Sequence, residues 1–272
     1  MSRAGLSRTL SRDIGVGAGV GAFSGLLGVG GGVVLIPYLT GIRRLAQKNA
    51  SATSLVLVFM SGLSGAITYA LHGQVAWFPA LFIVIGGLVG AWIGANVMQR
   101  LRNASLQIAF GLLLVIMAVR LLLAVNPDAM TSSADLPAMT MLAVIVYIAT
   151  GLVMGVLSAL FGIGGGIILL PVLVSVFAFS QQFANGTSLA VMVPVALLGA
   201  VRLTGPGLTD WRMGLPLGIG AIAGAILGAL IATMLQGDVI RICFAILLVF
   251  VGLSTIRRGW QSRRGEAGDV DS

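Results

Sequence analysis

Long apolar segments separated by short polar ones run along most of the chain. Six of these segments are long enough to cross a bilayer, which takes about 20 residues. They lie at residues 50–71, 76–98, 104–125, 184–203, 212–235 and 239–257. Two further apolar stretches, at 14–42 and 139–179, are each interrupted by a glycine cluster. The pattern predicts an all-α polytopic membrane protein, because a chain in lipid must satisfy its backbone hydrogen bonds within each segment.

A polar segment with two prolines divides this apolar pattern into two halves. We therefore expect a first and a second repeat, with a linker between them and a tail at each end. These parts are an N-terminal tail at 1–13, a first repeat at 14–125, a linker at 126–138, a second repeat at 139–257 and a C-terminal tail at 258–272.

The two halves repeat one another at a constant offset of 134 residues. Residues 24–37 match residues 158–171, and without a gap residues 50–55 fall on residues 184–189. The same offset aligns two stripes of small residues, which we expect to pack helices closely. The stripes are Gly86, Gly90 and Gly94 in the first half, and Gly220, Gly224 and Gly228 in the second. Duplicated halves are common in secondary transporters, which bind substrate at the interface between repeats.

The positive charges favour one of two topologies for these halves. If each glycine-broken stretch is a re-entrant hairpin, the repeats are inverted, and 14 of the 16 Lys and Arg residues lie on the cytoplasmic side. If each stretch crosses once, the repeats are parallel and only 10 lie there. Because cytoplasmic loops carry the Lys and Arg excess, we expect inverted repeats, each with a glycine-broken hairpin and three full spans. Both termini are then cytoplasmic, although residues 14–42 are short enough to cross once if tilted.

Composition narrows the function classes. The chain is 58% hydrophobic and only 9% charged, so it cannot cover a soluble surface with polar groups. Its net charge of +8 is too scattered for a nucleic-acid-binding face. With one cysteine, Cys243, and one histidine, His72, neither a metal site nor histidine-based catalysis is expected. No acidic residue is expected inside a span, because Asp13, Asp210 and Asp238 fall at predicted helix ends.

The motif Gly-x-Gly-Gly-Gly-x-x-x-x-Pro occurs once in each half. Glycine runs destabilise a helix, so each cluster predicts a break followed by a new helix. The free N–H groups and positive dipole end of that helix favour an anion. The alternative is that the glycines only permit tight helix packing. The candidate substrate-binding residues are Gly28, Gly30, Gly31, Gly32, Gly162, Gly164, Gly165 and Gly166, with Pro37 and Pro171 as structural residues.

A second motif, Ala-x-x-Thr-Ser, begins a span soon after each glycine cluster. It supplies Thr53 and Ser54 in the first half, and Thr187 and Ser188 in the second. These hydroxyls are candidates to donate hydrogen bonds to the oxygens of an anion. The alternative is that they bond to carbonyls within their own helix.

Together with Gly207-x-x-Asp-Trp211, these motifs resemble the TauE/SafE family over residues 14 to 257. The resemblance implies transport of small sulfur-containing or carboxylate anions across a cell inner membrane, without a cofactor and without enzyme activity. We expect a secondary transporter of sulfite or an organosulfonate. The alternatives are an anion channel-like pore and a permease for a small carboxylate. The expected partners are the anion and the lipid bilayer, not nucleic acid, and assembly into a homo-oligomer stays open.

Overall fold

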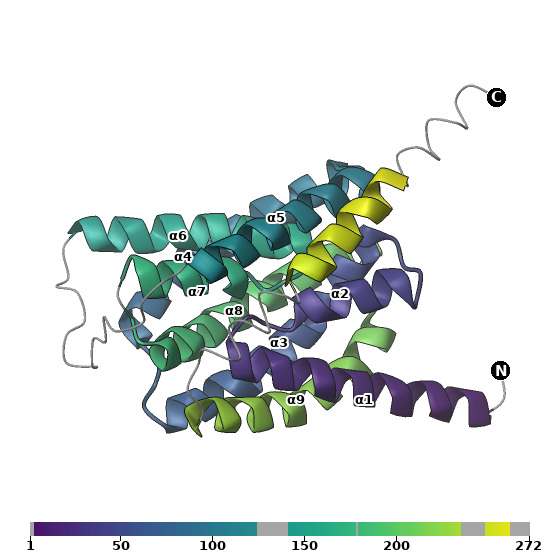
Figure 1. The fold of residues 1–272 in the computed structure, drawn as a ribbon, viewed down its shortest axis with the longest axis horizontal. Coiled ribbons are helices and arrows are strands. Elements are labelled where there is room, and N and C mark those ends of the chain that lie inside the picture. The colour runs from purple at the N-terminus through teal and green to yellow at the C-terminus, as the bar shows by residue number, and fades with distance from the viewer. Residues whose placement is uncertain (1–2, 124–140, 178, 235–247, 262–272) are drawn as a thin grey trace.

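The computed structural model describes residues 3–123, 141–177, 179–234 and 248–261, and these residues are almost wholly helical (Figure 1). The helices of the first half are α1 (Arg3–Leu27), α2 (Gly32–Gly41), α3 (Gln47–Leu71), α4 (Trp77–Arg100) and α5 (Asn103–Leu123). Those of the second half are α6 (Met141–Phe161), α7 (Gly166–Ser175), α8 (Gln181–Thr204) and α9 (Trp211–Met234), followed by a helix at 248–261. Within the described residues, α3, α4, α6, α8 and α9 are long and apolar enough to cross a membrane.

The two glycine-broken stretches form hairpins that enter the bundle from opposite ends. In Figure 1, α1 starts at the right-hand end and α2 returns toward it, whereas α6 starts at the left-hand end and α7 returns there. The first stretch is therefore a hairpin and not a single broken span. This arrangement confirms the expected fold class of two homologous halves in inverted orientation.

Each hairpin packs against the other half of the chain. Helix α1 lies along α9, and α6 lies along α4. A Cβ atom added to Gly86 would collide with the carbonyl oxygen of Ile148, and one added to Gly220 would collide with that of Ile14. These two contacts are related by the 134-residue offset, so the same interface forms twice. The glycine stripes of α4 and α9 therefore act as predicted, by letting two helix backbones approach closely.

Helices α3 and α8 form the centre of the bundle, where they pack against one another. A Cβ atom on Gly65 would lie 2.9 Å from a methyl carbon of Leu189, and one on Gly199 would lie 2.9 Å from a methyl carbon of Leu55. These contacts are again related by the offset. The pseudo-twofold axis between the halves therefore passes between α3 and α8, which also carry the Thr-Ser motifs.

Some boundaries differ from those expected. Helix α1 begins at Arg3, so it extends into the predicted tail and contains Asp13. The expectation that Asp13 lies at a helix end was therefore wrong, and its side chain is buried and paired with Arg43, which follows α2. The final helix extends to residue 261, beyond the predicted end at 257. The linker at 126–138, residues 262–272 of the tail, Cys243 and Asp238 lie outside the described residues.

Most described cationic residues lie at one end of the bundle. Helices α1, α3, α5 and α9 begin at this end, and α4, α8 and the final helix terminate there (Figure 1). Beyond α1, the cationic residues at this end are Arg43, Arg44, Lys48, Arg100, Arg102, Arg202, Arg212, Arg257 and Arg258. The first and last described residues therefore share the end of the molecule that carries the positive charge.

Candidate functional site

Both glycine clusters break their helices through left-handed backbone conformations. The φ angles in the two breaks lie between 64° and 86°. A side chain with a Cβ atom is strained in this region, whereas glycine is not. The residues concerned are Gly28, Gly30 and Gly31 in the first break, and Gly162, Gly164 and Gly165 in the second. The remaining predicted glycines, Gly32 and Gly166, are the first residues of α2 and α7.

The two breaks touch one another at the centre of the molecule. A Cβ atom on Gly32 would collide with the carbonyl oxygen of Gly162, and one on Gly166 would lie 2.7 Å from the carbonyl oxygen of Gly28. The first residue of each short helix, α2 or α7, therefore lies against the first glycine of the other break, although the two helices come from opposite ends of the bundle. Backbone groups, and not charged side chains, form this contact.

Each motif serine binds the break of the other half. The hydroxyl of Ser54 donates to the carbonyl oxygen of Gly162 at 2.6 Å, and it also lies 2.8 Å from the carbonyl oxygen of Ser51. The hydroxyl of Ser188 donates to the carbonyl oxygen of Gly28 at 3.0 Å. Both serines are fully buried. The structure thus brings both predicted serines to the predicted glycines, with bonding within the same helix only at Ser54.

The motif threonines hold two helix starts instead. The hydroxyl oxygen of Thr53 accepts the backbone N–H of Asp210 at 3.0 Å, just before α9. The hydroxyl oxygen of Thr187 accepts the backbone N–H of Ala76 at 3.0 Å, just before α4. The structure therefore separates the threonines from the glycine breaks, and their role in anion binding stays a prediction. Pro37 and Pro171 lie inside α2 and α7, one turn beyond each break.

A polar network beside the first break includes a residue that the sequence analysis did not single out. The hydroxyl of Tyr69 donates to the carbonyl oxygen of Gly25 at 3.1 Å, near the end of α1. The side-chain amide of Asn185 donates to the Tyr69 hydroxyl at 3.3 Å, and the amide of Gln181 donates to Asn185 at 2.9 Å. Tyr69 has no counterpart in the other half, where Leu203 occupies the equivalent position. A tyrosine inside an apolar run gave no signal of this contact.

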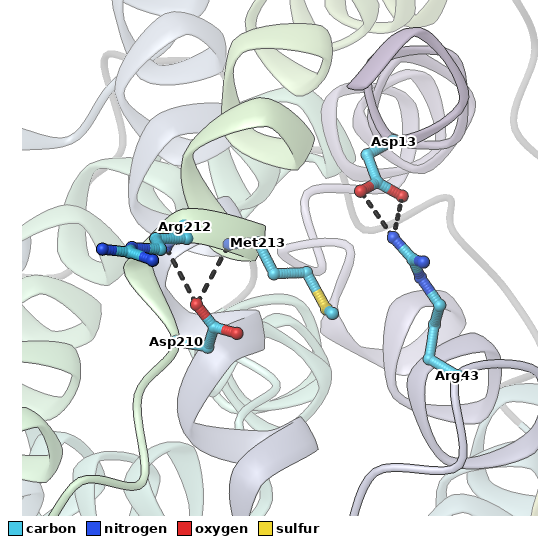
Figure 2. Close-up of polar contacts among 5 residues, drawn as sticks. All are labelled: Asp13, Arg43, Asp210, Arg212 and Met213. Carbon is cyan, nitrogen blue, oxygen red and sulfur yellow. Dashed lines mark hydrogen bonds and ion pairs between the residues drawn. The ribbon is translucent and has the colours of Figure 1, made fainter. Parts of the chain in front are cut away.

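The open ends of the two hairpins are closed by different chemistry. In the first hairpin, Arg43 forms a part-buried ion pair with Asp13 of α1 (Figure 2). The equivalent residues of the second hairpin, Tyr147 and Phe177, stack with ring centroids 4.4 Å apart. The pseudo-twofold symmetry of the backbone is therefore broken in side-chain chemistry, ionic at one end and aromatic at the other.

The two halves also differ at the start of α9, which has a side-chain cap that the equivalent helix α4 lacks. The carboxylate of Asp210 accepts the backbone N–H groups of Arg212 at 2.9 Å and Met213 at 3.2 Å (Figure 2). It therefore caps the helix and complements its dipole. At the equivalent position before α4 stands Ala76, which offers no side-chain cap. Among the described residues, no group of three His, Cys, Asp or Glu side chains is placed to hold a metal ion.

Comparison with known proteins gives the family. The family model described as sulfite exporter TauE/SafE matches residues 3–121 and 147–270, which is nearly the whole chain and includes both glycine breaks. The chain belongs to the TauE/SafE family. The match falls into two segments, one for each half of the structure.

Relatives of this TauE/SafE chain are named as membrane transporters. It is 29% identical over 257 residues to the probable membrane transporter protein YunE of Bacillus subtilis, covering 88% of this chain and 94% of that protein. It is 28% identical over 258 residues to a probable membrane transporter protein of Xylella fastidiosa, covering 94% and 98% respectively. No solved structure matched the chain. The TauE/SafE chain is therefore a multi-pass membrane protein of a transporter family, and that family is not one of enzymes.

Proposed function

We propose that this protein is a secondary transporter of a small sulfur-containing anion, sulfite or an organosulfonate, bound between the two glycine breaks. One observation carries the proposal. The N-terminal ends of α2 and α7 converge from opposite ends of the bundle onto a single contact of backbone groups. Helix N-termini favour anions through their N–H groups and dipoles, and broken helices at a repeat interface are where many secondary transporters bind substrate.

The chemistry around the breaks suits an anion. The described acidic residues are Asp13 and Asp210, and both lie toward the cationic end of the bundle. Along α1, Asp13 is 15 residues from Gly28, or about 22 Å at 1.5 Å per residue. The side-chain donors at the breaks are the hydroxyls of Ser54 and Ser188, which bind glycine carbonyls in this closed arrangement, and the amide of Asn185 beside Gly28. An entering anion would take over these donors without meeting a negative charge.

The hairpins provide a means of alternating access. Because α1 packs on α9 and α6 packs on α4 through backbone contacts, each pair would move as one unit against the central α3 and α8. Separation of the first hairpin from the centre would open the breaks toward one end of the bundle. Separation of the second would open them toward the other end. We assign the cationic end to the cytoplasm of a cell with an inner membrane, since Lys and Arg concentrate on that side.

Flux measurements in proteoliposomes test this function. We expect labelled sulfite or methanesulfonate to enter with saturable kinetics and to show counterflow. The double variant Gly31→Val, Gly165→Val should abolish this flux. Both positions have positive φ, and an added Cβ atom would lie 2.9 Å from Val20 at Gly31 and 2.5 Å from Met154 at Gly165. Size-exclusion profiles should show that the variant stays folded.

A matched control uses two other glycines of α1. Gly15 and Gly19 have nothing within 4 Å of an added Cβ atom, so the double variant Gly15→Ala, Gly19→Ala should retain full flux. Undiminished flux in the Gly31→Val, Gly165→Val variant would contradict the proposal that the anion binds at the glycine breaks. An absence of anion flux by the wild type, beside an active control transporter, would overturn the function. Unsaturable high conductance would identify a channel, and flux of acetate alone would identify a carboxylate permease.

A further inference from the structure

One side chain, Met192 of α8, fills the contact between the two glycine breaks. Cβ atoms added to Gly30, Gly164 and Gly166 would lie 3.0, 3.0 and 2.9 Å from its sulfur atom. Gly30 belongs to the first break, whereas Gly164 and Gly166 belong to the second. Met192 is completely buried. Its thioether therefore touches both breaks at the same point, directly against the first residue of α7.

The equivalent residue of the first half, Val58 of α3, is a much stiffer side chain. It is also completely buried, and a Cβ atom on Gly164 would collide with one of its methyl groups. Valine is branched at Cβ and has a strongly restricted χ1. Methionine is unbranched, with three rotatable bonds that let it fit irregular spaces. At the centre of the molecule, Met192 therefore has more rotamers open to it than Val58 has.

We propose that Met192 determines the size of the transported anion, an inference that rests on the function proposed above. An anion bound between the breaks needs space, and the backbones of the breaks are already in contact at Gly32 and Gly166. The Met192 side chain lies within 3.0 Å of added Cβ atoms in both breaks, so an anion held between them would need space that this side chain fills. The thioether carries no N–H or O–H donor, so it does not recognise charge. Charge is recognised by backbone N–H groups and the two serines, and size is limited by how far Met192 withdraws.

The test compares sulfite, methanesulfonate, ethanesulfonate and propanesulfonate as substrates in proteoliposomes. The variants are Met192→Ala, Met192→Val and Met192→Leu. Met192→Ala and Met192→Val remove volume, and we expect the ratio of propanesulfonate to methanesulfonate flux to rise about tenfold, as for a pocket enlarged by a methylene or more. Met192→Leu conserves volume and should keep the wild-type ratio.

Two controls separate size selection from a general loss of packing. Met98 of α4 is equally buried but outside the breaks, so Met98→Val should leave the flux ratio unchanged. If Met192→Ala does not fold, Met192→Val still tests the inference, because valine stands at the equivalent position 58. A uniform change in all four fluxes, with an unchanged ratio in both smaller variants, would overturn the role of Met192. Failure of the transport function itself is distinct, because the wild type would then carry none of the four anions.

Discussion

At the scale of single residues, Ser54 and Ser188 connect the halves by a reciprocal exchange of hydrogen bonds. Each serine stands on a central helix and donates to a glycine carbonyl in the other half. A carbonyl in a broken helix has lost its intrahelical N–H partner, and in a buried site it must find another donor. The serines therefore stabilise the closed contact of the breaks, and separation of the breaks, as proposed above, would release them as donors.

We expect Ser54→Ala and Ser188→Ala each to lower the free energy of unfolding by about 1–3 kcal/mol, the cost of a buried acceptor left without a donor. Each should also reduce anion flux, because a donor at the breaks is lost. Ser254→Ala is the matched control, since Ser254 donates only to Val251 of its own helix, and its effect should stay within about 0.5 kcal/mol. Thermal unfolding in detergent and flux in proteoliposomes measure the two effects. Equal stability of Ser54→Ala and the control would contradict the role of the hydrogen bond.

The adjacent threonines show why the sequence could predict the site only in part. The Thr-Ser motifs predicted hydroxyls that donate to an anion, and this stays a prediction. The structure places the two serines against the breaks, and the two threonines at the starts of other helices. Thr53 and Ser54 are successive helical residues, so their side chains point about 100° apart around the helix axis. Ser54 reaches Gly162, and Thr53 reaches the start of α9. The motif alone does not show which of its two side chains faces a break, because that depends on how the neighbouring helices pack.

At the scale of elements, the two hairpins share a backbone arrangement but differ in how their open ends are held. The first is closed by the ion pair of Asp13 and Arg43, and the second by the stacked rings of Tyr147 and Phe177. The sequence predicted both hairpins from the distribution of Lys and Arg residues, while the length of residues 14–42 left a single crossing open for the first. It did not predict the ion pair, because Asp13 was expected at a helix end and its partner is 30 residues away.

A double-mutant cycle measures the contribution of this ion pair. We expect Asp13→Asn and Arg43→Gln each to lower stability, because each leaves one charge of the pair without its partner. The double variant should lose less than the sum of the two, with a coupling of about 1 kcal/mol, since the Arg43 side chain is 21% exposed and partly screened. High salt should reduce the coupling. Thermal unfolding of the four proteins at low and high salt gives the values, and additive losses would show that the pair does not stabilise the hairpin.

At the scale of the whole molecule, the distribution of charge over the fold supports the membrane orientation proposed above. The described cationic residues concentrate at the end where α1 begins and the final helix terminates. The sequence predicted the repeat, but it could not predict which helices of the two halves pack against one another. Periodicity and offset show that two segments are alike, but not that α1 pairs with α9 and α6 with α4. Met192 was missed for a similar reason, since a methionine in an apolar helix looks like ordinary core.

Labelling of single cysteines tests the orientation. In a Cys243→Ser background, we expect Ala46→Cys to react with a membrane-impermeant thiol reagent only from the cytoplasmic side. His72→Cys should react only from the outer side. Both positions are exposed, and they lie at opposite ends of α3. Intact cells and inside-out vesicles supply the two sides. Labelling of both positions from one side would contradict the inverted topology.

The exchange of contacts between the halves also bears on how such a chain arose. The serine bonds, the threonine bonds and the glycine interfaces each occur twice, with the partner always in the other half. In an antiparallel dimer of a half-length chain, one sequence would form every one of these contacts, as a twofold interface requires. Such an ancestor would have to insert in both orientations, with little charge bias to choose between them. Fusion of two such copies would fix one orientation for each half and leave the two ends free to differ, as the ion pair and the aromatic stack do here.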